Sequence, residues 1–225
     1  MGLFREIGYA ALLVRALPKT LWFNFHYLPF RQAIRLPVLI GPHTRLAALR
    51  GRLIIEQPRF GSIRFGLCRN PMFDLDRPRP VWQVTGGIVR FSGRADLGAS
   101  TKFFVESGEL SFGRDFSANA NFSVSVQTGV SFGDDCLLSW DVTIMDHDFH
   151  HITDRQGNKT NPPAPVRIGH HVWIGCDCLL LKGAEIGDHC ILAAGSALSK
   201  KIEGSYQTLG GNPVRVLKQD TDWRK

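Results

Sequence analysis

Residues 168–202 read IGHHVWIGCDCLLLKGAEIGDHCILAAGSALSKKI, and an aliphatic residue recurs in this stretch at every sixth position. The recurring residues are Ile168, Ile174, Leu180, Ile186, Leu192 and Leu198. A small or apolar residue also stands four positions after each of the first five, at Val172, Cys178, Ala184, Cys190 and Ser196. A period of six is neither the 3.6-residue period of a helix nor the alternation of an ordinary strand.

A unit of six residues has room for a short strand and a turn. Three units would close a triangular coil of about 18 residues, and stacked coils would bury the repeated residues in one continuous core. Gly169, Gly175 and Gly187 each follow a repeated residue, where glycine would allow a tight corner. The repeat therefore predicts an all-β fold, a parallel β-helix. Its handedness does not follow from the spacing.

The same period extends upstream in shorter runs. The first run is Phe91, Leu97 and Phe103, the second is Phe112, Ala118, Val124 and Val130, and the third is Phe132, Leu138 and Ile144. The changes of register after Phe103 and after Val130 predict bulges or small loops. The interval from Ile144 to Ile168 is again a multiple of six, so the segment between them is expected to leave the phase intact.

The composition is that of a soluble globular protein with one principal domain. The 225 residues are 44% hydrophobic and 21% charged, and no apolar run approaches the roughly 20 residues of a membrane span. The formal net charge of +7 predicts an anionic partner, which could be a nucleic acid, a membrane surface or a phosphate-bearing small molecule. The five cysteines form no C-x-x-C pair and follow no signal peptide, so we expect a reduced, cytoplasmic protein.

The first 40 residues mix apolar and aromatic side chains with basic ones. The apolar spacing predicts an amphipathic helix that ends at Pro18, built on Leu3, Ile7, Ala10, Ala11 and Val14. The basic residues are Arg5, Arg15, Lys19, Arg31 and Arg35. Two interpretations of this extension, residues 1–50, stay open: peripheral contact with the inner face of the cell membrane, or packing on its own domain or another subunit.

The repeat, together with GGNPVRVLK at residues 210–218, resembles the hexapeptide-repeat acyltransferases. The resemblance covers about residues 85–218 and is closest to galactoside and maltose O-acetyltransferases and to the O-acetyltransferases of surface-polysaccharide synthesis. It implies a left-handed β-helix, here residues 51–218, with a protruding loop at 146–166 and a short C-terminal tail at 219–225. It also implies a homotrimer that binds acetyl-CoA in clefts between subunits and transfers the acetyl group to a sugar hydroxyl.

The segment IMDHDFHH, residues 144–151, is the candidate catalytic site. Transfer of an acetyl group to a hydroxyl needs a base, and the ordinary pKa of histidine, about 6.5, suits that role near neutral pH. The resemblance matches His147 to the catalytic histidine of the family. Asp146, Asp148 or a backbone carbonyl could hold one ring nitrogen protonated so that the other faces the hydroxyl.

The resemblance also implies the binding residues. The donor-side positions are Trp173, Cys176, Ala194, Ser199, Lys200, Arg215 and Lys218, although Cys176 stands where serine or glycine is common. The acceptor-side positions are Asn121, Asn119 and His150, with the loop 146–166 as a wall. The two asparagines could equally stabilise a coil turn through side-chain hydrogen bonds.

Other functions were weighed against this one. No metal is expected, because His147 and His151 share one loop with no cysteine near them, and His170, His171 and His189 are expected to be solvent-facing turn residues. No nucleic-acid-binding motif is present, and the phosphates of CoA together with a membrane would account for the basic charge. The alternatives to a polysaccharide O-acetyltransferase are acetylation of an antibiotic or amino sugar, and a non-catalytic β-helical scaffold.

Overall fold

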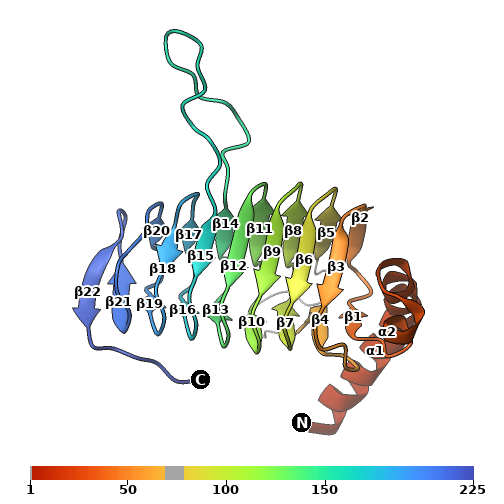
Figure 1. The fold of residues 1–225 in the computed structure, drawn as a ribbon. Coiled ribbons are helices and arrows are strands. Elements are labelled where there is room, and N and C mark those ends of the chain that lie inside the picture. Colours follow the sequence, from red (N-terminus) through yellow and green to blue (C-terminus); the bar gives the residue numbers. More distant parts are fainter. Residues whose placement is uncertain (1, 69–78) are drawn as a thin grey trace.

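The chain winds into three parallel sheets that form the sides of a prism, in a computed structural model that describes residues 2–68 and 79–225 (Figure 1). Sheet A contains β1 (Val38–Ile40), β4 (Ile63–Cys68), β7 (Ala95–Gly98), β10 (Phe116–Ala118), β13 (Leu137–Leu138), β16 (Trp173–Ile174), β19 (Ile191–Leu192), β21 (Gln207–Gly210) and β22 (Arg215–Gln219). Sheet B contains β2 (Arg45–Leu49), β5 (Val81–Val84), β8 (Lys102–Val105), β11 (Ser123–Val126), β14 (Thr143–Met145), β17 (Leu179–Leu180) and β20 (Ala197–Leu198). Sheet C contains β3 (Arg52–Ile55), β6 (Ile88–Phe91), β9 (Glu109–Phe112), β12 (Gly129–Phe132), β15 (Val166–Ile168) and β18 (Glu185–Ile186).

Successive strands visit sheets A, B and C in turn, so three strands make one coil of a left-handed parallel β-helix (Figure 1). The predicted repeat is confirmed by the pairing, because the repeated residues stack from coil to coil: Ile168 on Ile186, Ile174 on Leu192, and Leu180 on Leu198. Coils upstream are longer. Val89 pairs with Leu110 and Leu110 with Val130, intervals of 21 and 20 residues, which explains the changes of register in the sequence.

The core is a column of stacked side chains inside the prism. Phe91, Phe112 and Phe132 occupy one position in three successive coils, and their rings stack with interplanar angles of 9° and 3°. All three are buried, as are the cysteines that the repeat placed in the core, Cys136, Cys178 and Cys190. The first coil begins at Val38, inside the segment that the sequence assigned to the extension.

The N-terminal helix differs from the prediction. Helix α1 (Gly2–Tyr27) continues through Pro18, where the sequence predicted its end, and is followed by the short α2 (Phe30–Ala33). The predicted positions Leu3 and Ile7 lie outside the residues whose side chains are described.

Contacts with the β-helix hold the second half of α1 in place. Thr20 Oγ1 accepts from the amide of Ile40, and Asn24 both accepts from the amide of Val38 (3.2 Å) and donates to its carbonyl (2.7 Å). The helix therefore satisfies polar groups of the edge strand β1 and covers the open end of the β-helix. These bonds offset the one that Pro18 removes, which is why the helix does not stop there.

Two segments depart from the regular coils. The loop between β14 and β15 projects far from the prism as a narrow double strand (Figure 1), with one antiparallel bridge between Thr153 and Lys159. At the other end β22 pairs antiparallel with β21, and the tail after it runs back along the coils (Figure 1). Within the described ranges, no helix has the length and apolarity that crossing a membrane requires.

Candidate active site

His147 lies directly after β14, where the chain leaves sheet B for the protruding loop, and its side chain is buried. Its Nε2 is 2.9 Å from Ser125 Oγ, on the neighbouring strand β11, and its Nδ1 accepts from the amide of Phe149 at 3.2 Å. Because an amide N–H can only donate, Nδ1 carries no proton in this arrangement. The neutral ring therefore holds its proton on Nε2 and donates it to Ser125 Oγ. The sequence did not identify Ser125.

Asp146 does not hydrogen-bond to His147. Its carboxylate is buried and accepts three backbone N–H groups, from Gln127 (2.8 Å), Thr128 (2.6 Å) and Gly129 (2.6 Å). The carbonyl of Asp146 also accepts from the amide of Ala164 at the far end of the loop. These bonds make Asp146 the anchor of the turn before β12 rather than an orienting partner of the imidazole.

Asp148 does not bond to the ring either. It accepts from Lys182 Nζ (2.5 Å) and from Asn161 Nδ2 (2.7 Å), and Asn161 also donates to the carbonyl of His150. The hydrogen bond from Lys182 lowers the pKa of Asp148 from its ordinary value. Together these contacts close the base of the loop, so that both ends of residues 146–166 are tied to the β-helix beside His147.

A hollow of about 270 Å³ lies on the outer face of sheet B next to this histidine. Its floor comes from β8, β11 and β14, including Ser125, and the exposed ring of Phe149 forms one wall. The ring of Phe149 also stands edge-on to His147, with 4.3 Å between centroids. A larger hollow, about 870 Å³, runs over sheet C. His147 itself lines neither hollow, but Ser125 and Phe149, which both contact His147, line the smaller one. The chemistry therefore points to the smaller hollow.

The predicted donor-side residues fall into two groups. Trp173 is on β16 in sheet A, and Cys176 and Ala194 lie in stacked turns between sheets A and B, where the amide of Gly195 donates to the carbonyl of Cys176 (2.9 Å). The other residues are exposed: Ser199 and Lys200 follow β20, and Arg215 and Lys218 are on β22.

The first of these two groups lies apart from His147. His147 stands where sheet B ends and leads toward sheet C, whereas Trp173, Cys176 and Ala194 stand on the other side of sheet B. One chain therefore presents these two parts of the predicted site on different edges of the prism.

The predicted acceptor residues lie elsewhere. Asn121 adopts a left-handed backbone (φ 61°) at a corner before β11, and its Nδ2 donates to Asp141 Oδ1 at the equivalent corner of the next coil (2.9 Å). This contact supports the turn-stabilising alternative for Asn121. Asn119 directly follows β10, and His150 is exposed at the start of the loop.

The chain is similar in sequence to known transferases. Residues 165–200 match the family model described as bacterial transferase hexapeptide (six repeats). The galactoside O-acetyltransferase of Escherichia coli (strain K12) is 31% identical over 122 residues, which are 53% of this chain and 59% of the relative. A chloramphenicol acetyltransferase of Agrobacterium fabrum is 30% identical over 69 residues, 31% of this chain and 32% of the relative.

Among solved structures, the polySia-specific acetyltransferase NeuO matches 84% of this chain and 82% of its own with a TM-score of 0.63. At 19% identity this likeness concerns the fold. These matches confirm the resemblance to the hexapeptide-repeat acyltransferases that the sequence indicated: residues 165–200 carry the repeat of that family model, and the fold is shared. The chain spans less than two thirds of the curated relatives named above.

Proposed function

We propose that the chain is an acetyl-CoA-dependent O-acetyltransferase that modifies a sugar hydroxyl in surface-polysaccharide synthesis, with His147 as general base. The observation that carries this proposal is the buried imidazole of His147, held between Ser125 and Phe149 beside an apolar hollow. A scaffold would not need a buried, doubly hydrogen-bonded histidine at the mouth of a long loop.

The reaction would use the imidazole twice. The sugar hydroxyl attacks the thioester carbonyl of acetyl-CoA while a ring nitrogen takes its proton, and the same proton then passes to the departing CoA thiolate. If Nε2 is that nitrogen, the proton it now donates to Ser125 must move to Nδ1. The amide of Phe149 must then turn away from Nδ1. Phe149 has a left-handed backbone (φ 60°), a strained conformation for a bulky residue, so the hydrogen bond depends on a turn that substrate could rearrange.

We further propose that the complete site forms between copies of the chain in a homotrimer. The separation of His147 from Trp173, Cys176 and Ala194 across sheet B supports this assembly, because acetyl-CoA bound along Trp173, Cys176 and Ala194 would reach the histidine of a neighbour. Lys200, Arg215 and Lys218 are exposed cations suited to the phosphates of CoA.

The test is thiol release from acetyl-CoA with mono- and oligosaccharide acceptors, comparing wild type with His147→Ala. His151→Ala is the matched control, because His151 is an exposed histidine of the same loop. We expect His147→Ala to lower kcat by about 100-fold or more while CoA binding remains, and His151→Ala to leave it nearly unchanged. Equal turnover in the two variants would contradict the mechanism.

The same assay separates the alternatives. Turnover with chloramphenicol or an amino sugar, and none with neutral saccharides, would replace the acceptor and keep the base. Absence of CoA binding in wild type would favour the scaffold.

The proposal includes contact of the N-terminal segment with the cytoplasmic face of a membrane. Helices α1 and α2, with Ile34 directly after α2, expose several large apolar side chains. Val14, Phe30 and Ile34 are 71%, 68% and 60% exposed, and Leu17, Leu21, Trp22 and Phe25 are exposed too. The exposed Arg15, Arg31 and Arg35 lie among them, and no acidic residue occurs between Glu6 and Glu56. An apolar face with only basic charge around it fits an anionic lipid surface.

Vesicle sedimentation tests this contact. Ile34→Ser should weaken binding to vesicles that contain phosphatidylglycerol, whereas Ile152→Ser, which removes an equally exposed isoleucine from the protruding loop, should not. No binding by wild type, or association of the chain through this face in size-exclusion chromatography, would assign the face to a protein partner.

A further inference from the structure

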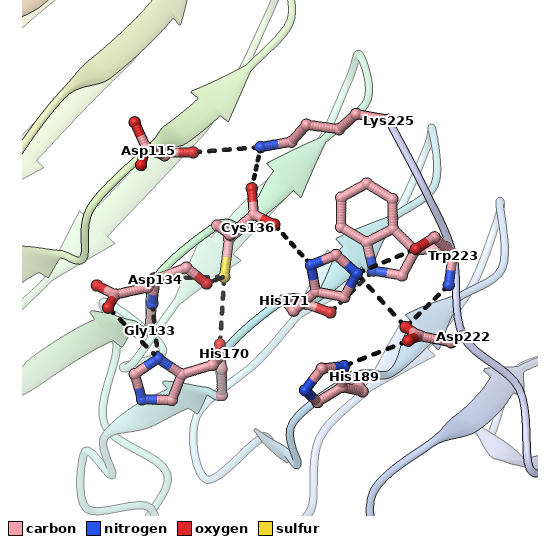
Figure 2. A network of polar contacts seen from close by, with 12 residues as sticks. Asp115, Gly133, Asp134, Cys136, His170, His171, His189, Asp222, Trp223 and Lys225 are labelled. Atoms are coloured by element: carbon pink, nitrogen blue, oxygen red, sulfur yellow. Dashed lines mark hydrogen bonds and ion pairs between the residues drawn. The ribbon is translucent and has the colours of Figure 1, made fainter.

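One corner of the β-helix carries equivalent residues in successive coils. Asp135, His171 and His189 each precede a strand of sheet A and adopt the same left-handed backbone, with φ values of 57°, 52° and 56°. His171 and His189 are 18 residues apart, which is the length of one coil in the part of the chain after the loop, and their ring centroids are 5.0 Å apart. Stacking of coils therefore places two histidines side by side at this corner (Figure 2).

The C-terminal tail covers this corner and supplies a carboxylate (Figure 2). Trp223 is buried: its indole N–H donates to the carbonyl of His171 (2.8 Å), and its ring stacks on the imidazole at 4.5 Å. This contact places Asp222 between the histidines, with Oδ1 3.4 Å from His171 Nε2 and Oδ2 3.5 Å from His189 Nδ1. The sequence expectation of solvent-facing histidines is therefore wrong for His171 and His189, which the tail partly covers, and holds for the exposed His170.

The three side chains offer the ligands and spacing of a zinc site. The donor atoms all lie within 4.8 Å of one another. Tetrahedral zinc with bonds of about 2.0–2.2 Å to nitrogen and oxygen separates its ligand atoms by roughly 3.3–3.5 Å. Asp222 Oδ1 lies at such a distance from His171 Nε2, and the other oxygen, Oδ2, lies at such a distance from His189 Nδ1. His189 Nδ1 is a buried atom, and its contact with Asp222 Oδ2 at 3.5 Å is long for a hydrogen bond, a state that a metal would relieve.

Both rings are already fixed in orientation. Asp135 Oδ2 lies 2.6 Å from His171 Nδ1, the carboxylate–histidine arrangement that commonly aims the other ring nitrogen at a metal. That other nitrogen, Nε2, lies 3.0 Å from the carbonyl of Trp223, a contact that a metal would replace. The ring of His189 stacks on Tyr206 at 4.4 Å. Asp222 is exposed, so a fourth coordination position can be filled by water.

We propose that His171, His189 and Asp222 bind one zinc ion that fastens the C-terminal tail to the β-helix. The site is separate from His147, and its role is structural. It does not depend on the acetyl-transfer function, so either proposal can fail alone.

The alternative to a bound metal ion is a protonated, positively charged His171. Burial alone would lower the pKa of His171, but its hydrogen bonds to the Trp223 carbonyl and to Asp135 raise it above the ordinary value. A protonated ring could hold Asp135 and Asp222 without a metal. That arrangement leaves His189 Nδ1 with only its long contact to Asp222, whereas zinc would engage both rings.

The test measures metal binding by the full chain. After removal of metal with a chelator, wild type should bind one equivalent of zinc in calorimetry, and Co²⁺ in its place should give the visible absorption of a tetrahedral site. His189→Ala and Asp222→Asn should each weaken zinc binding by at least about 10–100-fold, with circular dichroism to check folding. His151→Ala removes a histidine that has no place in the cluster and should change nothing.

Digestion by carboxypeptidase gives an independent readout of the tail. Zinc should slow loss of residues 222–225 in wild type but not in Asp222→Asn. No zinc binding by wild type, or equal affinity in wild type and His189→Ala, would overturn the proposal and leave the proton as the occupant.

Discussion

Replacing Asp146 with asparagine would separate an anchoring carboxylate from a catalytic one. The wild-type carboxylate uses Oδ1 for Gln127 and Oδ2 for both Thr128 and Gly129. Asparagine has one oxygen, so its amide N–H₂ must face at least one of these N–H donors. A hydrogen bond to a charged group contributes about 1.5–3 kcal/mol, so losing one and weakening two should destabilise the chain by about 2–4 kcal/mol.

Urea unfolding followed by circular dichroism measures this change at a fixed chain concentration, which matters if the chain is oligomeric. Asp148→Asn is the matched control, because Asp148 is exposed and should lose much less stability. A change below about 0.5 kcal/mol for Asp146→Asn would refute the anchoring role, since that is the effect of an ordinary surface substitution. Loss of kcat at unchanged stability would instead make Asp146 a positioning residue for His147.

Two further outcomes follow from particular contacts. In Gly108→Ala the added Cβ would lie 2.1 Å from the backbone oxygen of Thr128, and φ is +66°. In Gly157→Ala φ is +84° but nothing lies within 4 Å of the added Cβ, so the cost should be about 1–2 kcal/mol. The melting temperature should therefore fall far more in Gly108→Ala than in Gly157→Ala. Equal losses of melting temperature would show that the positive φ alone, and not the close contact, causes the destabilisation. Because Lys182 lowers the pKa of Asp148, their pair stabilises the fold above the unfolded-state pKa of about 3.9 and loses this contribution as pH falls through the lower folded-state value. The melting temperature should therefore fall less steeply between pH 6 and pH 3 in Lys182→Met than in wild type. Parallel dependence on pH in the two proteins would contradict a stabilising pair.

The coiled architecture could be predicted from the sequence because each six-residue unit contains an apolar residue that marks which position is buried. The repeated residues lie inside, and the pairing of Ile168 with Ile186 follows directly from their spacing. The end of α1 was predicted wrongly for the opposite reason. Local sequence rules predict that a helix ends at Pro18. The hydrogen bonds that stabilise α1 as far as Tyr27 are made with strand β1, which follows the helix in sequence. Such contacts have no local signal.

The candidate site shows the same division. His147 could be proposed from its motif and the family resemblance, but its partner Ser125 is 22 residues upstream and meets it only because Ser125 pairs with Met145 across β11 and β14. The roles of Asp146 and Asp148 could not be separated in sequence, because their partners lie far from them along the chain: Asp146 is buried against the turn before β12, and Asp148 is exposed and bonds to Lys182 and Asn161. Burial decides between them.

Once the coil length is known, sequence separation becomes a rule for contacts between side chains. After the loop, residues 18 apart are neighbours: Arg167 bonds to Glu185 at 2.6 Å, and His171 lies beside His189. Pairs of histidines at this spacing could thus be recognised from sequence as candidate metal ligands in a β-helix. Asp222 could not, because it belongs to a tail outside the repeat and arrives through the packing of Trp223. The stacking of coils therefore brings the two histidines of such a site together, and the packing of the C-terminal tail adds the third ligand, Asp222.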